Sequence, residues 1–452
     1  MTSMTLIEKF AAFAADTDPA RIPATALDQA RQCLVDWFAV GTGAANLAEA
    51  AAVARALQAR QAPRGDAATL LTGGQTSAAD AALGNGMLSH ILDFDDTHVP
   101  SILHGSGPIW AALLAVGEVH RIPEDRLLAA FVIGFQAGTR LGSHGLGERL
   151  TRQGWHATPT LGRIAAATAI SHARGFDRVK AAHAIALAAS QATGYTRSFG
   201  TMAKPLNAGR AAADAVLAAD LAEAAVQGPL DILDGSDGLL QTMLQDRELT
   251  LDPMARDLLD PPWEVARNSF KPYASCQLTH GAIDAARALS SRVAPGHIRR
   301  IQAYTHPLAI RIAGRDSAHT PTEAKFSLRF CIALGLSGHA CTMKDFGDAR
   351  IADAALQALA ARVELFPDES ATRTSARLVV VDDDGGEFSE SVAHAFGSIE
   401  NPMGWEPLER KFFELVQDRF TAEQSRALFD TLSRFGQPGG LAACMRRVAA
   451  AG

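Results

Sequence analysis

The chain lacks a basic tract, a paired-cysteine motif and an apolar run of membrane-spanning length. Its 452 residues carry a net charge of -7, which argues against nonspecific nucleic-acid binding because such binding depends on clustered lysine and arginine. The five cysteines are odd in number and include no C-x-x-C pair, so neither a disulfide framework nor a zinc knuckle is expected. The segment RLLAAFVIGFQAG is shorter than the ~20 residues of a membrane helix, and the N-terminus has no signal-peptide pattern. These absences predict a soluble protein of the reducing cytoplasm.

An alanine-rich helical pattern extends from Leu6 to about Pro262, with apolar positions recurring every three or four residues. One helix is expected in NAGRAAADAVLAADLAEAAVQG, with Asn207 as its N-cap and Gly228 at its end. An alanine-rich helix buries little area alone, so we expect these helices to pack in several layers and to form a subunit interface.

The pattern changes after His297, where RRIQAYTHPLAI and RVELFPDE are typical of strands. The segment ARLVVVDDDGGEFSESVAHAF predicts two strands joined by a turn at Asp384 to Gly386. Helical pattern then returns, and TAEQ forms a capping box that starts at Thr421 and opens a helix ending near Phe435. We therefore expect an α+β insert, after which the C-terminal helices rejoin the first domain.

Ionisable side chains are densest in GNGMLSHILDFDDTHVPSILHGSGPIWAALLA, at the end of an apolar helix. If that helix includes Ser89 to Asp96, then His90, Asp93 and Thr97 are three or four residues apart and share one face. His104 precedes a glycine-rich turn and a new apolar run, which predicts that it lies at the mouth of a helix. One loop could then carry a general base and the carboxylate that orients it.

Four further segments place polar residues in apolar surroundings: GWHATPTLG, GTMAKPLNAGRAA, KPYASCQLTHGAIDAA and PTEAKFSLRF. Their polar candidates are His156, Lys204, Arg210, Lys271, Cys276, His280 and Lys325. Tens of residues separate these segments, so only folding could unite them.

Taken in order after LDFDDTH and HGSGPIWAAL, these segments resemble the MmgE/PrpD family. That family includes 2-methylcitrate dehydratases, cis-aconitate decarboxylases and iminodisuccinate epimerase, and the resemblance covers roughly Leu6 to Phe435. It implies a mainly α fold, with a large all-helical domain built from both chain ends, 1–266 and 401–452. A smaller α+β domain with an antiparallel sheet, 267–400, is inserted between them. The resemblance also implies a cleft at the domain junction and a homodimer.

The family's active-site pattern, carried over by resemblance, falls on Asp93, Thr97, His104, His156, Lys204 and Lys271. Two positions depart from the decarboxylases of the family. Cys276 stands where those enzymes have a histidine, and Phe330 stands where they have a tyrosine. Both departures argue against decarboxylation.

These residue types suit the removal of a proton from a carbon next to a carboxylate. Such a reaction needs a base of near-neutral pKa and fixed cations close to the developing enediolate. Held by Asp93, His104 could alternate between base and acid, with His156 assisting proton transfer. Lys204 and Lys271 could bind substrate carboxylates and offset the charge. No cofactor and no metal are expected.

We therefore expect a cofactor-independent homodimeric enzyme that acts on a small di- or tricarboxylic acid. Dehydration of the 2-methylcitrate dehydratase type is the leading interpretation, with Thr97 orienting His104 or the substrate. Epimerisation of the iminodisuccinate type, through the same carbanion and with Lys271 or His156 as the second acid, is the alternative. Decarboxylation is less favoured, and the sequence does not separate dehydration from epimerisation.

Each candidate also has a structural interpretation. The aspartates could be solvated or could cap a turn, and His90 could be a core histidine. Cys276 and His280 are four residues apart, like a nucleophile and its base. A buried inert cysteine fits better, because the expected reaction needs no covalent intermediate. Lys325 and Arg210 could contact substrate or pair with carboxylates.

Two other classes of protein share some of these sequence features. Magnesium-dependent prenyl-diphosphate enzymes also carry aspartates on helices. After Asp95 and Asp96, however, no third carboxylate follows one turn later to complete a metal cluster. A noncatalytic helical scaffold would explain the alanine-rich helices, but it leaves the buried-looking lysines and histidines without a role.

Overall fold

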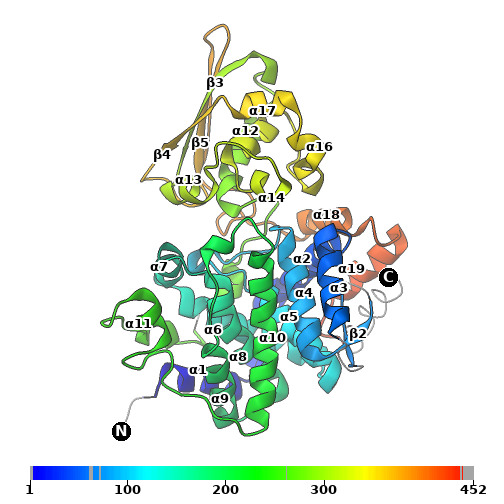
Figure 1. The fold of residues 1–452 in the computed structure, drawn as a ribbon, viewed down its shortest axis with the longest axis vertical. Helices are drawn as coiled ribbons and strands as arrows, with labels where there is room; N and C mark the ends of the chain where they lie inside the picture. The colour runs from blue at the N-terminus through cyan, green and yellow to red at the C-terminus, as the bar shows by residue number, and fades with distance from the viewer. Residues whose placement is uncertain (1–3, 61–64, 71–72, 261, 438–439, 441–452) are drawn as a thin grey trace. The chain divides into compact units, whose positions relative to one another are not determined.

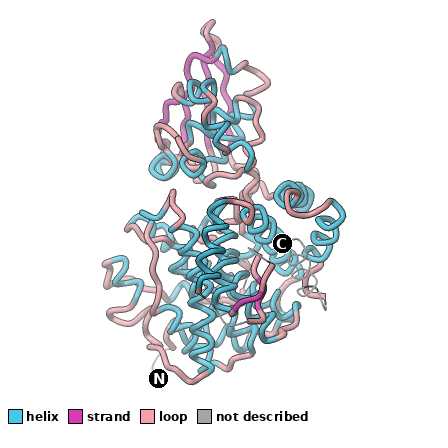
Figure 2. The backbone as a smooth tube through the Cα atoms, turned by 45° about the vertical axis from the view of Figure 1, so that its right-hand side comes forward, coloured by secondary structure: helices cyan, strands magenta, loops and turns pink. Residues whose placement is uncertain are grey.

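The computed structural model describes residues 4–60, 65–70, 73–260, 262–437 and 440. The chain is mainly α-helical, as predicted (Figure 2). It divides into two compact units. The first unit contains Met1–Ile91, Asp95–Asn268 and Trp405–Gly452, and the second contains Leu92–Phe94 and Ser269–Gly404.

The first unit is a layered helical assembly (Figure 1). Its helices are α1 (Leu6–Asp16), α2 (Ala24–Ala44), α3 (Ala48–Ala59), α4 (Ala78–Ile91), α5 (Ser106–His120), α6 (Glu124–Gly142), α7 (Leu146–Arg152), α8 (Ala157–Arg174), α9 (Arg178–Ala189), α10 (Ala203–Glu223), α11 (Leu239–Leu244), α18 (Trp405–Val416) and α19 (Ala422–Ser433). Helix α10 packs against α4, α8 and α9, while α6 packs against α8 and α18 packs against α2. A short antiparallel pair, β1 (Ala67–Ala68) and β2 (Gln75–Thr76), lies beside α4 and α5.

Small residues allow α4 and α10 to approach closely. A Cβ atom added to Gly86 would lie 2.9 Å from the Cα atom of Gly209, and one added to Gly209 would lie 2.3 Å from the carbonyl oxygen of Leu83. Contacts of that kind do not occur between real side chains and backbone. The two helices therefore meet with backbone against backbone.

Two helix boundaries differ from the prediction. Helix α10 begins at Ala203, so Asn207 lies inside it and is not its N-cap, and the helix ends at Glu223 rather than near Gly228. Proline in a first helical turn is tolerated because its missing N–H would have no partner there, which lets Pro205 fit within the earlier start. The capping box of Thr421 is confirmed, and its helix ends at Ser433.

The second unit combines one sheet with short helices. Its strands are β3 (Ile298–Thr305), β4 (Val363–Pro367), β5 (Ala376–Asp382) and β6 (Glu387–Val392), in the spatial order β4-β3-β5-β6. Its helices are α12 (His280–Leu289), α13 (Pro307–Ala313), α14 (Pro321–Ala324), α15 (Leu328–Leu336), α16 (Asp348–Ile351) and α17 (Ala354–Ala360). Helix α12 packs against β5, β6 and α15.

The expected antiparallel sheet is wrong in one respect, because the sheet is mixed. Strands β3 and β4 run parallel, with Ile301 paired to Val363, whereas β3–β5 and β5–β6 are antiparallel. A parallel pair needs a long crossover connection, and the segment that holds α13 to α17 supplies it. The hairpin predicted around Asp384 to Gly386 is confirmed by the β5–β6 pairing.

None of the helices in the described part of the chain is both long enough and apolar enough to cross a lipid bilayer.

Candidate active site

The segment that follows α4 is not helical, so the predicted shared face of His90, Asp93 and Thr97 is wrong. Helix α4 ends at Ile91, and Asp93 takes a left-handed conformation with φ of 53°. Aspartate tolerates this conformation better than most residues, because its short side chain can hydrogen-bond locally. Beyond that turn, helical spacing no longer decides which side chains meet.

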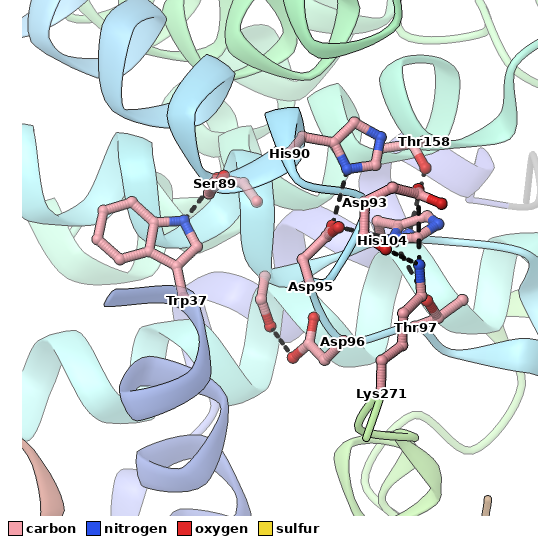
Figure 3. A network of polar contacts seen from close by, with 12 residues as sticks. Trp37, Ser89, His90, Asp93, Asp95, Asp96, Thr97, His104, Thr158 and Lys271 are labelled. Atoms are coloured by element: carbon pink, nitrogen blue, oxygen red, sulfur yellow. Dashed lines mark hydrogen bonds and ion pairs between the residues drawn. The ribbon is translucent and has the colours of Figure 1, made fainter. Parts of the chain in front are cut away.

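Asp95 holds two histidine rings with one carboxylate oxygen (Figure 3). Its Oδ2 atom lies 2.8 Å from Nδ1 of His90 and 2.9 Å from Nδ1 of His104. The two ring centroids are 4.7 Å apart. Nδ1 of His104 is thus bound by Asp95, whereas the sequence-based expectation named Asp93 as its partner.

The charge state of Asp95 fixes the roles of the ring nitrogens. Burial alone would raise its pKa, but the neighbouring His90 and His104 place the pKa of this carboxyl well below its usual range. An ionised carboxylate only accepts hydrogen bonds, so each Nδ1 donates to it. In both rings Nε2 is then the nitrogen that can take up or release a proton.

His104 lies at the N-terminal mouth of α5, as predicted. Its backbone N–H donates to Oγ1 of Thr158 at 3.2 Å, and its Nδ1 atom is 3.3 Å from Oγ1 of Thr97. The side chain of His104 is 14% exposed, whereas Asp95 is almost fully buried. The imidazole is therefore held from its backbone and from Nδ1 while solvent still reaches the ring.

Two distant motifs come together beside His90. His156, which precedes α8, has its ring stacked 6.1 Å from that of His90 and 4.9 Å from that of Phe199. Nζ of Lys204 lies 5.4 Å from the centroid of the same Phe199 ring, and Nδ2 of Asn207 lies 3.5 Å from Nδ1 of His156. Folding thus unites three of the expected site residues, His104, His156 and Lys204, within the first unit.

A buried polar network that the sequence analysis did not identify holds the backbone next to Asp95. Oδ2 of Asp96 accepts hydrogen bonds from Ser106 at 2.5 Å and from Asn268 at 2.7 Å. The backbone N–H of Asp96 donates to Asp36, which pairs with Lys411 at 2.6 Å. Burial, followed by the negative charge of Asp36, raises the pKa of Asp96 to about 7.

In the second unit, two buried lysines bind the turn at Leu92–Phe94. Nζ of Lys271 donates to the carbonyl oxygen of Asp93 at 2.7 Å and lies 3.5 Å from its Oδ1 atom. Nζ of Lys325 donates to the carbonyl oxygen of Leu92 at 2.7 Å. Lys325, for which substrate contact and ion pairing were both open, thus binds a backbone carbonyl, and both lysines stabilise the left-handed turn.

Cys276 and His280 also belong to the second unit and are buried. Nε2 of His280 lies 3.3 Å from the carbonyl oxygen of Ser275, at the start of α12. Phe330 lies in α15 with its ring 6.3 Å from that of Phe346. These contacts describe a packed apolar environment around Phe330 and a backbone-bonded imidazole at His280.

Arg210 forms an ion pair with Asp214 along α10, and Arg163 contacts the same aspartate at 3.0 Å. The side chain of Arg210 is 48% exposed. Of the two outcomes left open for Arg210, pairing with a carboxylate is the one observed.

The described site can move protons and bind anions. Two imidazoles share one anchoring carboxylate, the ring of His156 stacks on that of His90, and the ammonium of Lys204 lies 5.4 Å from the centroid of the Phe199 ring. Acid–base catalysis needs a proton-exchanging group of near-neutral pKa that is held in place. The residues that sequence analysis missed as positioning groups are Asp95, Asp96, Asp36, Ser106, Asn268 and Lys411.

Comparison with known proteins assigns the family. The MmgE/PrpD N-terminal domain matches residues 8–252, and the MmgE/PrpD C-terminal domain matches residues 273–434. A cis-aconitate decarboxylase of Aspergillus terreus is 23% identical over 422 residues, covering 87% of this chain and 86% of the relative. Those of Homo sapiens and Mus musculus are 27% and 28% identical, each covering 74% of this chain and 71% and 70% of the relative. Because the two domain matches together span most of its length, this chain belongs to the MmgE/PrpD family.

Proposed function

We propose that this protein is an enzyme that removes a proton from the carbon next to a carboxylate of a small di- or tricarboxylic acid and then eliminates water. The observation that carries the proposal is the shared Oδ2 atom of Asp95, which binds Nδ1 of both His90 and His104. This contact fixes the ring orientation and tautomer of His104 and stabilises the imidazolium that forms when Nε2 accepts a proton.

In this proposal, two histidines account for both proton transfers of the dehydration. His104 takes the proton from carbon, the electron pair left behind forms the new carbon–carbon double bond, and the carbon–oxygen bond to the hydroxyl breaks. His156 donates a proton to that hydroxyl, which leaves as water. Thr97, 3.3 Å from Nδ1 of His104, helps to hold the base.

Cationic side chains would bind the substrate carboxylates. Lys204 carries its ammonium next to the Phe199 ring that also contacts His156. The ammonium of Lys271, the other cation expected to bind a carboxylate, donates to the Asp93 carbonyl at 2.7 Å and lies 3.5 Å from the Asp93 Oδ1 atom. Each charged hydrogen bond to a carboxylate would contribute ~1.5–3 kcal/mol.

Decarboxylation is the second candidate, and the names of the relatives favour it, because those from Aspergillus terreus, Homo sapiens and Mus musculus are cis-aconitate decarboxylases. Against it stand Cys276 and Phe330, which replace the histidine and tyrosine expected in the decarboxylases. Epimerisation stays a third outcome, since the same carbanion can be reprotonated on its opposite face by His156 or Lys271.

Proton NMR in deuterium oxide separates these reactions. The substrates to compare are citrate, 2-methylcitrate, cis-aconitate, tartrate, malate and iminodisuccinate. A new alkene signal from a hydroxy acid is the expected result and would identify dehydration. Deuterium incorporation without an alkene would identify epimerisation, and release of carbon dioxide would identify decarboxylation.

The same preparation tests the noncatalytic alternative. If none of these acids reacts and none raises the melting temperature, the proposed enzymatic function is wrong and a noncatalytic scaffold is the better interpretation. The homodimer and the cytoplasmic location remain predictions, and light scattering after size-exclusion chromatography measures the first of them.

A further inference from the structure

Three metal-ligating side chains converge in the first unit. One ring nitrogen each of His90 and His104 and a carboxylate oxygen of Asp95 all lie within 4.8 Å of one another. His90 and Asp95 are each 1% exposed. This residue set, two imidazoles and one carboxylate, is one that binds first-row divalent metals.

Two atoms of this cluster retain binding capacity in the described part of the chain. Nε2 of His90 and Oδ1 of Asp95 are buried and have no hydrogen-bond partner among the residues described. An unsatisfied buried polar atom costs about 1–3 kcal/mol. A cation beside the carboxylate would offset part of that cost at Asp95.

We propose that His90, Asp95 and His104 form an inhibitory Zn²⁺ site. The ion would replace the two Nδ1 protons that now lie between the rings and the carboxylate. With Zn–N and Zn–O bonds of ~2.0–2.2 Å, tetrahedral ligands stand roughly 3.3 Å apart. The present nitrogen–oxygen separations of 2.8 and 2.9 Å would therefore widen by about 0.5 Å. The two ring nitrogens, which lie within 4.8 Å of each other, would settle at the same tetrahedral spacing.

The ligand chemistry favours Zn²⁺ over the abundant hard cations. Mg²⁺ and Ca²⁺ prefer shells made of oxygen atoms, whereas imidazole suits Zn²⁺. Asp95 is the only charged ligand of the three when the imidazoles are neutral. Three protein ligands leave a fourth position for water, and the 14% exposure of the His104 side chain provides access from solvent.

Zinc at this position would block the proposed reaction. Once Nδ1 of His104 binds the metal, the proton of the neutral ring moves to Nε2, which can no longer accept one from the substrate. This inhibitory consequence rests on the proposed function, but the binding itself does not. Zinc binding and catalysis can therefore fail independently in experiment.

The test is calorimetric titration of ZnCl₂ into the full chain, treated with EDTA and dialysed, without substrate. We expect one site per chain that His90→Gln weakens at least a hundredfold, with the same result for His104→Gln. The matched control is His394→Gln, which removes a half-exposed histidine 3.7 Å from Glu400 and should leave that site unchanged. Circular dichroism verifies that each variant is folded.

A second measurement reports on ligand geometry without activity. Cobalt(II) bound in place of zinc should give the intense visible absorption of a tetrahedral nitrogen–oxygen site, and MgCl₂ should neither produce heat at this site nor displace the cobalt. The proposal is overturned if the wild type binds no zinc at a single site, or if folded His90→Gln and His104→Gln bind zinc as the wild type does. If the metal-free enzyme is inactive on every acid, the proposed function fails while the zinc site stands.

Discussion

Nδ1 of His104 lies 2.9 Å from Oδ2 of Asp95, within a cluster that is closed to solvent on the aspartate side and open on the histidine side. In the proposed function, Asp95 is a positioning residue and His104 is the residue that exchanges protons. The two side chains can therefore be tested separately.

Replacing His104, the proposed base, should lower turnover strongly without unfolding the protein. His104→Gln removes Nε2 as a proton acceptor, and general acid–base catalysis contributes typically about 10²–10⁴ in rate. We expect kcat to fall by about that factor in the NMR assay, while the melting temperature changes by only a few degrees because the side chain is partly exposed. His394→Gln serves as the control, and a fully active His104→Gln enzyme would remove this residue from the mechanism.

Removing the anchoring charge should affect both rate and acid stability. In Asp95→Asn the amide no longer fixes the Nδ1–H tautomers, so we expect kcat to fall by about 10²–10⁴ with a smaller change in KM. The pKa of Asp95 is lowered in the folded protein. Its ionised form therefore stabilises the fold above the unfolded value near 3.8, and that contribution is lost as pH falls through the lowered pKa.

Urea unfolding between pH 3 and pH 7 measures this second effect. The stability advantage of the wild type over Asp95→Asn should be largest above pH 5 and should shrink toward pH 3. The exposed Asp418 provides a matched change, since Asp418→Asn should leave both rate and pH dependence as in the wild type. An advantage that grows on acidification would contradict the assignment.

Asp96 should have the opposite pH dependence. Its pKa is raised from 3.8 to about 7 in the folded protein, so ionisation favours the unfolded state and stability falls as pH rises from about 4 to about 7. Asp96→Asn keeps an oxygen for Ser106 and Asn268 but cannot ionise. As pH rises across this range, the unfolding free energy of Asp96→Asn should increase relative to that of the wild type, by at most about 4 kcal/mol. This difference should level off above pH 8. A difference in unfolding free energy that does not vary with pH would contradict it.

The contact between α4 and α10 predicts a steric effect. A methyl group at position 209 would lie 2.3 Å from the carbonyl oxygen of Leu83 and 2.7 Å from Cγ of Met87. Gly209→Ala should therefore destabilise the protein by roughly 1–3 kcal/mol in urea unfolding, as overpacked cores do. Gly296→Ala is the control, because a Cβ atom there meets nothing within 4 Å. Equal stability of the two variants would mean that the helices can separate without cost.

The sequence predicted the positions of helices and strands better than it predicted which strands pair with each other. Helical periodicity and β-rich segments identified most of the regular structure, including the strands β5 and β6 on either side of the Asp384 turn. The parallel pairing of β3 with β4 was missed, because some sixty residues separate them and local pattern carries no register over that distance. The early start of α10 was missed because Asn207 is a residue type that favours the N-cap position, whereas the helix already begins at Ala203.

The sequence predicted which residue types gather at the site, but it did not predict which side chains contact each other. LDFDDTH contains three aspartates, and helical spacing selected Asp93 as the partner of the base. The left-handed residue at Asp93 ends that periodicity, and Asp95 takes the position instead. Helix α4 already ends at Ile91, and the local sequence did not indicate this end or the left-handed turn that follows it. Asp36 and Lys411, 375 residues apart, could be paired only by the fold.

The direct meeting of Gly86 with Gly209 has a consequence for how this protein can vary. Gly86 lies one turn before His90, and Gly209 lies little more than one turn after Lys204, so a change in helix spacing would shift an imidazole and an ammonium together. No side chain separates the backbones of the two helices where Gly86 meets Gly209. Mutational tolerance should therefore be low at these two positions, although neither glycine has a side chain that could take part in a reaction.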